Sequence, residues 1–272
     1  MKLRAPLRAV VAALVAAAGL LMAAPLPANA AAASKATIRD TATKQFPVVR
    51  ISVLVDGELL PSGAFHVREN GKKIPDNEIQ VRQLAETGRA VGTVLVVDSS
   101  GSMLSRAAMG QAKAAAKQFV AARKPNESIA IVSFAGQAQV ATDFTQDIGL
   151  LNKVIDQLAA EGETALWDGL ATGARLLSKS PNLQPNIVLI SDGGDTVSSL
   201  DQTGALAAIS GAHATVLAVG LQTNEFNPAT LRSVVGPSGV LLTNTDPATL
   251  TGELQRLRGV IDNQYEVIYT SA

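Results

Sequence analysis

The most regular pattern along the chain is an alternation of short apolar runs with longer segments in which apolar residues recur every three or four positions. The apolar runs predict buried strands, and the three-to-four spacing predicts helices. Strands are expected at 91–98, 128–134, 137–144, 186–192, 214–219 and 239–243. Helices are expected at 105–123, 147–158, 166–178, 201–210, 228–235 and 247–257. Because crossovers between parallel strands are right-handed, this alternation predicts an α/β fold, a doubly wound and mostly parallel sheet with helices on both faces.

Both flanks of this α/β region show a different pattern, in which apolar and polar residues alternate over short stretches. Strands are expected at 48–55, 64–68, 78–84 and 265–269. A meander of this size can hardly bury a core alone. We therefore expect residues 46–87 and the C-terminal strand within 259–272 to form one small β-domain, into which the α/β domain of residues 88–258 is inserted. Residues 31–45, rich in Ala, Ser and Thr, are expected to form a flexible N-terminus.

The first thirty residues have the pattern of a secretory signal peptide. Lys2, Arg4 and Arg8 precede an uncharged run at 9–24, and small residues follow up to Ala30. The alternative is an uncleaved membrane anchor, but the run has 16 residues and a bilayer span needs about 20. The pattern predicts cleavage near Ala30 and a secreted or cell-surface protein.

Composition narrows the chemistry further. The chain has no cysteine, which excludes a disulfide-linked oligomer, thiolate metal ligands and a cysteine nucleophile. Its formal net charge is zero, and without the three basic residues of the signal peptide it has 20 basic against 23 acidic residues. This balance argues against nucleic acid as a partner.

Candidate chemistry lies where the strand at 91–98 ends. Asp98 is followed by Ser100 and Ser102, and ligands of open parallel sheets bind just outside the carboxyl ends of the strands. These side chains offer only oxygen ligands, which suit hard cations such as Mg²⁺. The strand at 186–192 repeats the arrangement and ends at Asp192 before two glycines. The alternative is that Asp98 and its serines merely cap the next helix.

Three segments, at 94–103, 162–168 and 189–193, resemble a von Willebrand factor type A domain of the bacterial secreted or envelope type, and the resemblance covers roughly 88–258. It implies a metal-ion-dependent adhesion site. The residues that match this motif are Asp98, Ser100, Ser102, Thr164 and Asp192. The implied cofactor is a divalent cation, Mg²⁺ first and Mn²⁺ or Ca²⁺ as alternatives, whose coordination is completed by an acidic side chain of a protein ligand.

Three further acidic residues border these loops and are candidates to support the ligands or to bind the ion through water: Glu163, Asp168 and Asp195. We expect Asp168 to support the loop that carries Thr164, and the alternative is an ordinary acidic residue in the first turn of the helix. For Glu163 and Asp195 the alternative is an ordinary solvated loop carboxylate, since such residues are rarely buried.

Enzyme motifs are missing from the sequence. It contains no phosphate-binding loop, no Gly-x-Ser-x-Gly and no Ser-x-x-Lys, and His66 and His213 lie away from the serine-rich loop. We therefore expect no enzyme but an extracytoplasmic protein-binding module that depends on a divalent cation. The alternative is a scaffold or assembly component of a larger membrane or envelope complex, and a hydrolase is the third and weakest candidate.

Overall fold

A computed structural model describes residues 35–237, 239–243 and 249–271. The signal peptide predicted at 1–30 lies outside these residues. The chain forms two compact units: unit 1 comprises both flanks, up to Thr87 and from Asn263 onward, and unit 2 comprises Gly88–Asp262. No helix in the described part of the chain is both long and apolar enough to cross a membrane.

Unit 2 is built on a six-stranded sheet with the order β11-β10-β9-β6-β7-β8. The pairs from β11 to β7 are parallel, and β8 at one edge is antiparallel to β7. The strands are β6 (Val91–Asp98), β7 (Glu127–Phe134), β8 (Ala138–Thr145), β9 (Gln184–Ser191), β10 (Thr215–Gly220) and β11 (Val240–Leu242). The parallel strands place their carboxyl ends along one edge, which is where the loops of interest begin.

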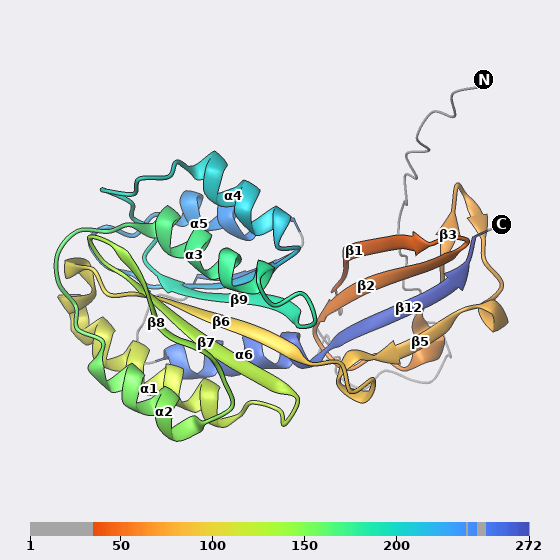
Figure 1. The fold of residues 1–272 in the computed structure, drawn as a ribbon, viewed down its shortest axis with the longest axis horizontal. Helices are drawn as coiled ribbons and strands as arrows, with labels where there is room; N and C mark the ends of the chain where they lie inside the picture. The colour runs from red at the N-terminus through yellow and green to blue at the C-terminus, as the bar shows by residue number, and fades with distance from the viewer. Residues whose placement is uncertain (1–34, 238, 244–248, 272) are drawn as a thin grey trace, which may run out of the picture. The chain divides into compact units, whose positions relative to one another are not determined.

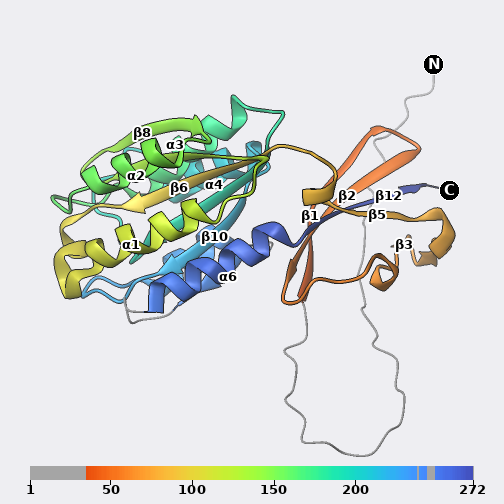
Figure 2. The ribbon, with the colours of Figure 1, turned by 90° about the horizontal axis from the view of Figure 1, so that it is seen from below.

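Helices cover both faces of this sheet. They are α1 (Ala108–Ala121), α2 (Ile148–Gln157), α3 (Leu166–Ser178), α4 (Gln202–Gly211), α5 (Pro228–Val235) and α6 (Leu250–Asp262), and a 3-10 helix, η4 (Gly101–Ala107), precedes α1. Figure 1 shows α3, α4 and α5 on one face and α1, α2 and α6 on the other. In Figure 2, α1 and α6 run side by side. The predicted doubly wound, mostly parallel α/β fold is confirmed.

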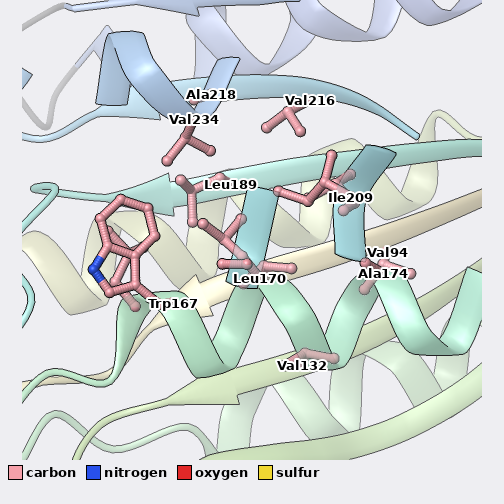
Figure 3. Packing of buried hydrophobic residues seen from close by; sticks show 14 of the residues in the cluster. Val94, Val132, Trp167, Leu170, Ala174, Leu189, Ile209, Val216, Ala218 and Val234 are labelled. Atoms are coloured by element: carbon pink, nitrogen blue, oxygen red, sulfur yellow. The ribbon is translucent and has the colours of Figure 1, made fainter. Parts of the chain in front are cut away.

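The core between α3 and the sheet holds the two central strands in place. Figure 3 shows Leu170 and Ala174 of α3 packed with Val94 of β6 and Leu189 of β9. All four are fully buried. β6 is apolar and fully buried from position 94 to 97, as expected for a central strand that helices cover on both faces, and the polar loop begins where this apolar run ends, at Asp98.

A buried ion pair anchors α6. The Arg258 guanidinium of α6 binds the carboxylate of Glu127, the first residue of β7, and donates a second hydrogen bond to the Phe119 carbonyl of α1 at 3.0 Å. Its charge also lies 3.8 Å from the Phe119 ring centroid. The Thr93 hydroxyl donates to the same Glu127 carboxylate at 2.5 Å. This network joins α6, α1 and two strands at the end of the sheet opposite the loops.

Unit 1 is a four-stranded sheet with the order β1-β2-β12-β5. Its elements are β1 (Lys35–Gln45), β2 (Val48–Asp56), η1 (Ser62–Ala64), β3 (Arg68–Glu69), β4 (Lys72–Lys73), η2 (Asp76–Glu78), β5 (Gln80–Gln83), η3 (Leu84–Glu86) and β12 (Gln264–Thr270). The last strand, β12, pairs antiparallel with both β2 and β5. The segments on both sides of unit 2 in the sequence thus share one sheet.

Two expectations for this unit are wrong. Residues 35–45 are not a mobile terminus but strand β1, which pairs with β2. An edge strand needs apolar contact on one face only, which Ala36 and Ile38 provide. Residues 64–68 do not form the expected strand. Phe65 and Val67 are buried against the sheet without pairing in it, so their alternation reflects packing alone.

Two helix boundaries in unit 2 also differ from expectation. The helix expected from residue 105 begins at Ala108, because Ala107 has a φ of 56° and separates η4 from α1. The last helix continues to Asp262 rather than ending at residue 257, and unit 2 likewise ends at Asp262 rather than at 258. Residues 244–248, where this helix was expected to begin, lie outside the described residues.

Candidate metal site at the carboxyl edge of the sheet

The sheet topology brings the two aspartates of the candidate site together. β6 and β9 are parallel neighbours, and Val97 pairs with Ile190 near the carboxyl end of each strand. Asp98 is the last residue of β6, and Asp192 directly follows β9. The two carboxylates therefore leave adjacent strands at the same edge.

Serine hydroxyls connect these carboxylates. The Ser100 hydroxyl donates to Asp98 Oδ1 at 2.5 Å, and the Ser102 hydroxyl donates to Asp192 Oδ2 at 2.6 Å. The two serine oxygens are 3.1 Å apart. The backbone N–H of Ser100 also donates to Asp98 Oδ1, at 2.9 Å, which turns the loop back on the strand end. Four of the five predicted metal ligands thus form one continuous set of oxygens.

The loop that carries Thr164 packs against this set. The Gly101 N–H donates to the Gly162 carbonyl at 2.9 Å, which joins the serine loop to the threonine loop. Thr164 itself is buried and is held through its backbone, whose N–H donates to Thr196 Oγ1 at 3.0 Å and whose carbonyl accepts from Thr196 N–H at 2.8 Å. Its hydroxyl makes no hydrogen bond with the part of the chain that the structure describes. That hydroxyl is free to bind a ligand.

Both carboxylates are buried without a compensating positive charge. Asp98 and Asp192 have no exposed surface, and neither forms an ion pair with a Lys or Arg among the described residues. Burial, together with the nearby Asp192 carboxylate, raises the pKa of Asp98 to about 6, against the lowering effect of the hydrogen bonds from Ser100 and Ser191. A bound cation would compensate this buried negative charge.

The donor set suits a hard divalent cation. The five candidate ligands are two carboxylates and three hydroxyls, so every donor is an oxygen atom. Two carboxylates with neutral hydroxyls match the oxygen chemistry of Mg²⁺, which keeps several waters and uses one or two carboxylates. The residues present therefore fit the expected ion, with Asp98, Ser100, Ser102 and Asp192 in place and Thr164 beside them.

Two residues that the sequence analysis did not select complete the arrangement. Ser191 donates through its hydroxyl to Asp98 Oδ2 at 2.7 Å, and Thr223 donates through its hydroxyl to Asp192 Oδ2 at 2.6 Å. Ser191 could have been selected because it precedes Asp192 at the end of a central strand. Thr223 follows the next strand, β10, and only the strand order places its loop beside Asp192.

The three further acidic residues accept hydrogen bonds from residues outside the set of candidate ligands. The Glu163 carboxylate accepts from Thr196 Oγ1 at 2.8 Å, and Asp195 Oδ1 accepts from Ser198 Oγ at 2.5 Å. Asp168 lies in the first turn of α3, and its carboxylate accepts the N–H groups of residues 199 and 200, at 2.8 and 3.0 Å. A carboxylate at the start of α3 bonds there because the free N–H groups of the neighbouring loop face it.

Comparison with known proteins agrees with this geometry. Residues 93–194 match the family model of the von Willebrand factor type A domain. The chain contains a von Willebrand factor type A domain. No curated protein sequence matched the chain. The family match includes all five predicted ligands and ends two residues after Asp192, so it covers the chain from β6 to the end of β9, including the loops that carry these ligands.

Solved structures share the fold at low sequence identity. A von Willebrand factor type A protein from Catenulispora acidiphila is 19% identical with a TM-score of 0.57, over 83% of this chain and 48% of that one, so this chain spans about half of its length. The von Willebrand domain of the type V pilus tip protein Mfa5 from Porphyromonas gingivalis is 15% identical with a TM-score of 0.54, over 64% and 95%. Proximal thread matrix protein 1 from the mussel byssus, with a zinc-occupied MIDAS motif, is 16% identical with a TM-score of 0.55, over 71% and 50%.

The raised pKa of Asp98 predicts an unusual pH dependence for the metal-free type A domain. The folded pKa of about 6 lies above the ordinary value of 3.8, so the folded state binds the proton more tightly than the unfolded state. Stability from this group is therefore complete below about pH 4, falls as the pH rises through 6, and stays low above it. Thermal melts in chelator between about pH 4.5 and pH 7.5 measure the trend. If Asp98→Asn followed the same pH trend, Asp98 would not be its source.

Thr223 is expected to support metal binding indirectly. Thr223→Val removes the hydroxyl that orients Asp192, and loss of such a supporting hydrogen bond typically lowers metal affinity by about 10- to 100-fold. Mg²⁺ titrations followed by the shift in melting temperature measure the affinity. Thr203→Val, the same change at an exposed position of α4, is the control and should leave the affinity unchanged. Equal affinities for the two variants would contradict the role of Thr223.

Proposed function

We propose that this protein is an extracytoplasmic interaction module whose type A domain binds a protein partner through a divalent cation. The proposed ligands are Asp98, Ser100, Ser102, Thr164 and Asp192, and Mg²⁺ is the proposed ion. The observation that carries the proposal is the pair of fully buried carboxylates, joined by serine hydroxyls and lacking a positive partner in the described chain.

The open coordination of such an ion explains why the partner would supply a carboxylate. Mg²⁺ demands octahedral geometry and retains exchangeable waters when protein ligands are few. The three hydroxyl ligands are neutral, so the two aspartates would be the only anionic ligands from the chain, and the coordination positions held by water would stay open to a further anionic oxygen. An acidic side chain of a partner would then replace a water and complete the coordination. Type A domains are generally interaction modules rather than enzymes, which agrees with this role.

Location and metal are also part of the proposal. The sequence pattern of residues 1–30 supports export, and the solved relatives include a pilus tip protein and a byssus matrix protein. The zinc-occupied MIDAS motif of the byssus protein supports a divalent cation at the matching site of this chain. The all-oxygen donor set favours Mg²⁺ over zinc here, because zinc prefers nitrogen and sulfur ligands.

The test is partner capture on the immobilised full chain, from the envelope and secreted fractions of the producing cell. We expect a partner that is retained in Mg²⁺, released by chelator and not retained by Asp98→Ala. Retention that is indifferent to both changes would contradict the metal-dependent mechanism.

A scaffold role in a larger envelope assembly is the second candidate. Unit 1 favours it, because this separate β unit is built from both flanks of the chain and its sheet has two edge strands, β1 and β5. A partner that stays bound in chelator and to Asp98→Ala, but is lost when β1 is deleted, would support the scaffold role instead.

A further inference from the structure

A groove lies directly beside the candidate metal site. It has a volume of about 430 Å³ and is lined by residues 135–137, which connect β7 to β8, by the first two residues of β8, and by Glu161 and Gly162. Gly162 is also the residue whose carbonyl accepts the Gly101 N–H between the two serine ligands. One wall of the groove is therefore in direct contact with the metal-binding loop.

The lining of the groove combines polar and apolar surface and includes one charged side chain. Gln137, Gln139 and Glu161 are exposed, and Glu161 is the charged residue among those that line the groove. The Glu161 N–H donates to the Ser99 carbonyl at 2.9 Å, which fixes its backbone against the serine loop. Its carboxylate makes no ion pair or hydrogen bond with the described residues. It is available to a ligand.

Neighbouring acidic side chains differ from Glu161 in this respect. The carboxylates of Glu163 and Asp195 already accept hydrogen bonds from Thr196 and Ser198. Glu225 is exposed on the same edge of the sheet but belongs to the loop after β10, on the other side of the site from the groove. Position and lack of partners thus single out Glu161.

We propose that the groove binds the stretch of the partner chain next to the metal-bound carboxylate, and that Glu161 selects Lys or Arg in that stretch. This inference rests on the proposed function. Glu161 lies three residues before Thr164, so their Cα atoms are at most roughly 11 Å apart. An extended partner segment covers that distance in about three residues. The partner motif is therefore an acidic residue with a basic residue within about three positions, since a second acidic residue there would face Glu161.

The size of the effect follows from the exposure of the pair. Ion pairs between exposed side chains are worth little, so we expect the basic residue to improve affinity by up to about fivefold. Selection among many peptides detects such a preference more readily than one binding constant does.

The experiment begins with random short peptides displayed on phage, selected on the full chain in Mg²⁺ and eluted with chelator. We expect the selected peptides to be enriched in an acidic residue with Lys or Arg nearby. One selected peptide and its Lys→Gln variant are then measured against wild type, Glu161→Gln and the matched control Glu225→Gln. The peptide variant should bind wild type and the control about two- to fivefold more weakly than the parent peptide does. For Glu161→Gln, the two peptides should have equal affinities.

The outcomes separate the two levels of the proposal. Two outcomes would overturn the groove assignment and leave the metal-dependent function standing. In one, the selected peptides are acidic but not enriched in basic neighbours. In the other, the Lys→Gln change in the peptide weakens binding to Glu161→Gln as much as binding to the wild type. An effect of Glu225→Gln equal to that of Glu161→Gln would show that general acidity, not the groove, makes the selection. If no peptide is eluted by chelator, both the groove assignment and the proposed function fail.

Discussion

Arg258→Ala is expected to lower the free energy of unfolding by about 3–5 kcal/mol, because it leaves the Glu127 carboxylate buried without its cation. Both side chains are almost entirely buried, so solvent does not screen the loss. The substitution also removes the hydrogen bond to the Phe119 carbonyl and the contact with its ring. The penalty arises chiefly from the unpaired charge and not from the value of the pair itself.

Urea unfolding of the wild type and of two alanine variants measures this effect. Arg256→Ala changes an exposed arginine on the same helix and should cost less than about 1 kcal/mol. The double variant Glu127→Gln with Arg258→Met removes both charges and should recover part of the stability. A cost for Arg258→Ala no larger than that for Arg256→Ala would show that the pair does not anchor α6.

Asp98→Asn is expected to change stability in opposite directions with and without metal. At about pH 7.5 in chelator, the wild type has a buried ionised carboxylate whose pKa is raised from 3.8 to about 6, a shift that corresponds to roughly 3 kcal/mol. The neutral amide avoids this penalty, so the metal-free variant should be more stable by up to about that amount. Saturating Mg²⁺, at about one hundred times its Kd, should stabilise the wild type by about 2.7 kcal/mol and the variant not at all.

Thermal melts of both proteins, with chelator and with Mg²⁺, follow this reversal. Asp143→Asn, the same change at an exposed carboxylate of β8, is the control and should respond to Mg²⁺ as the wild type does. A variant that is less stable than the wild type in chelator would mean that the hydrogen bonds of Asp98 outweigh its desolvation. An equal Mg²⁺ response in wild type and Asp98→Asn would exclude Asp98 as a ligand.

The spacing of hydrophobic residues predicted the helices and strands of unit 2 more accurately than those of unit 1. The helices at 166–178 and 228–235 have the expected bounds, because their buried faces recur at helical spacing and Pro228 marks the start of the second. In unit 1 the alternation of apolar and polar residues was a weaker guide to the strands. A strand such as β1 is held by backbone pairing along one edge, while the buried Phe65 and Val67 imitate a strand without pairing. Which strands pair is decided by the tertiary structure, and the local alternation of apolar and polar residues does not reveal it.

The candidate site likewise contains residues that the local sequence predicts and residues that only the tertiary structure identifies. Asp98, Ser100 and Ser102 lie close together in sequence, so the local pattern was enough to propose an oxygen site. Asp192 could be added because its strand ends in the same way. The role of Thr223 depends on β10 lying next to β9, and the hydrogen bonds of Asp168 depend on where the loop at 199–200 lies. Both require the strand order and the loop path, which no motif records.

Direct titration of Mg²⁺ into metal-free protein by calorimetry tests whether the carboxyl edge of the type A domain is a divalent-cation site. We expect one binding event for the wild type and none for Asp98→Asn, with Asp143→Asn binding like the wild type. Binding of equal strength to the wild type and Asp98→Asn, or no binding to either, would contradict the assignment of this site.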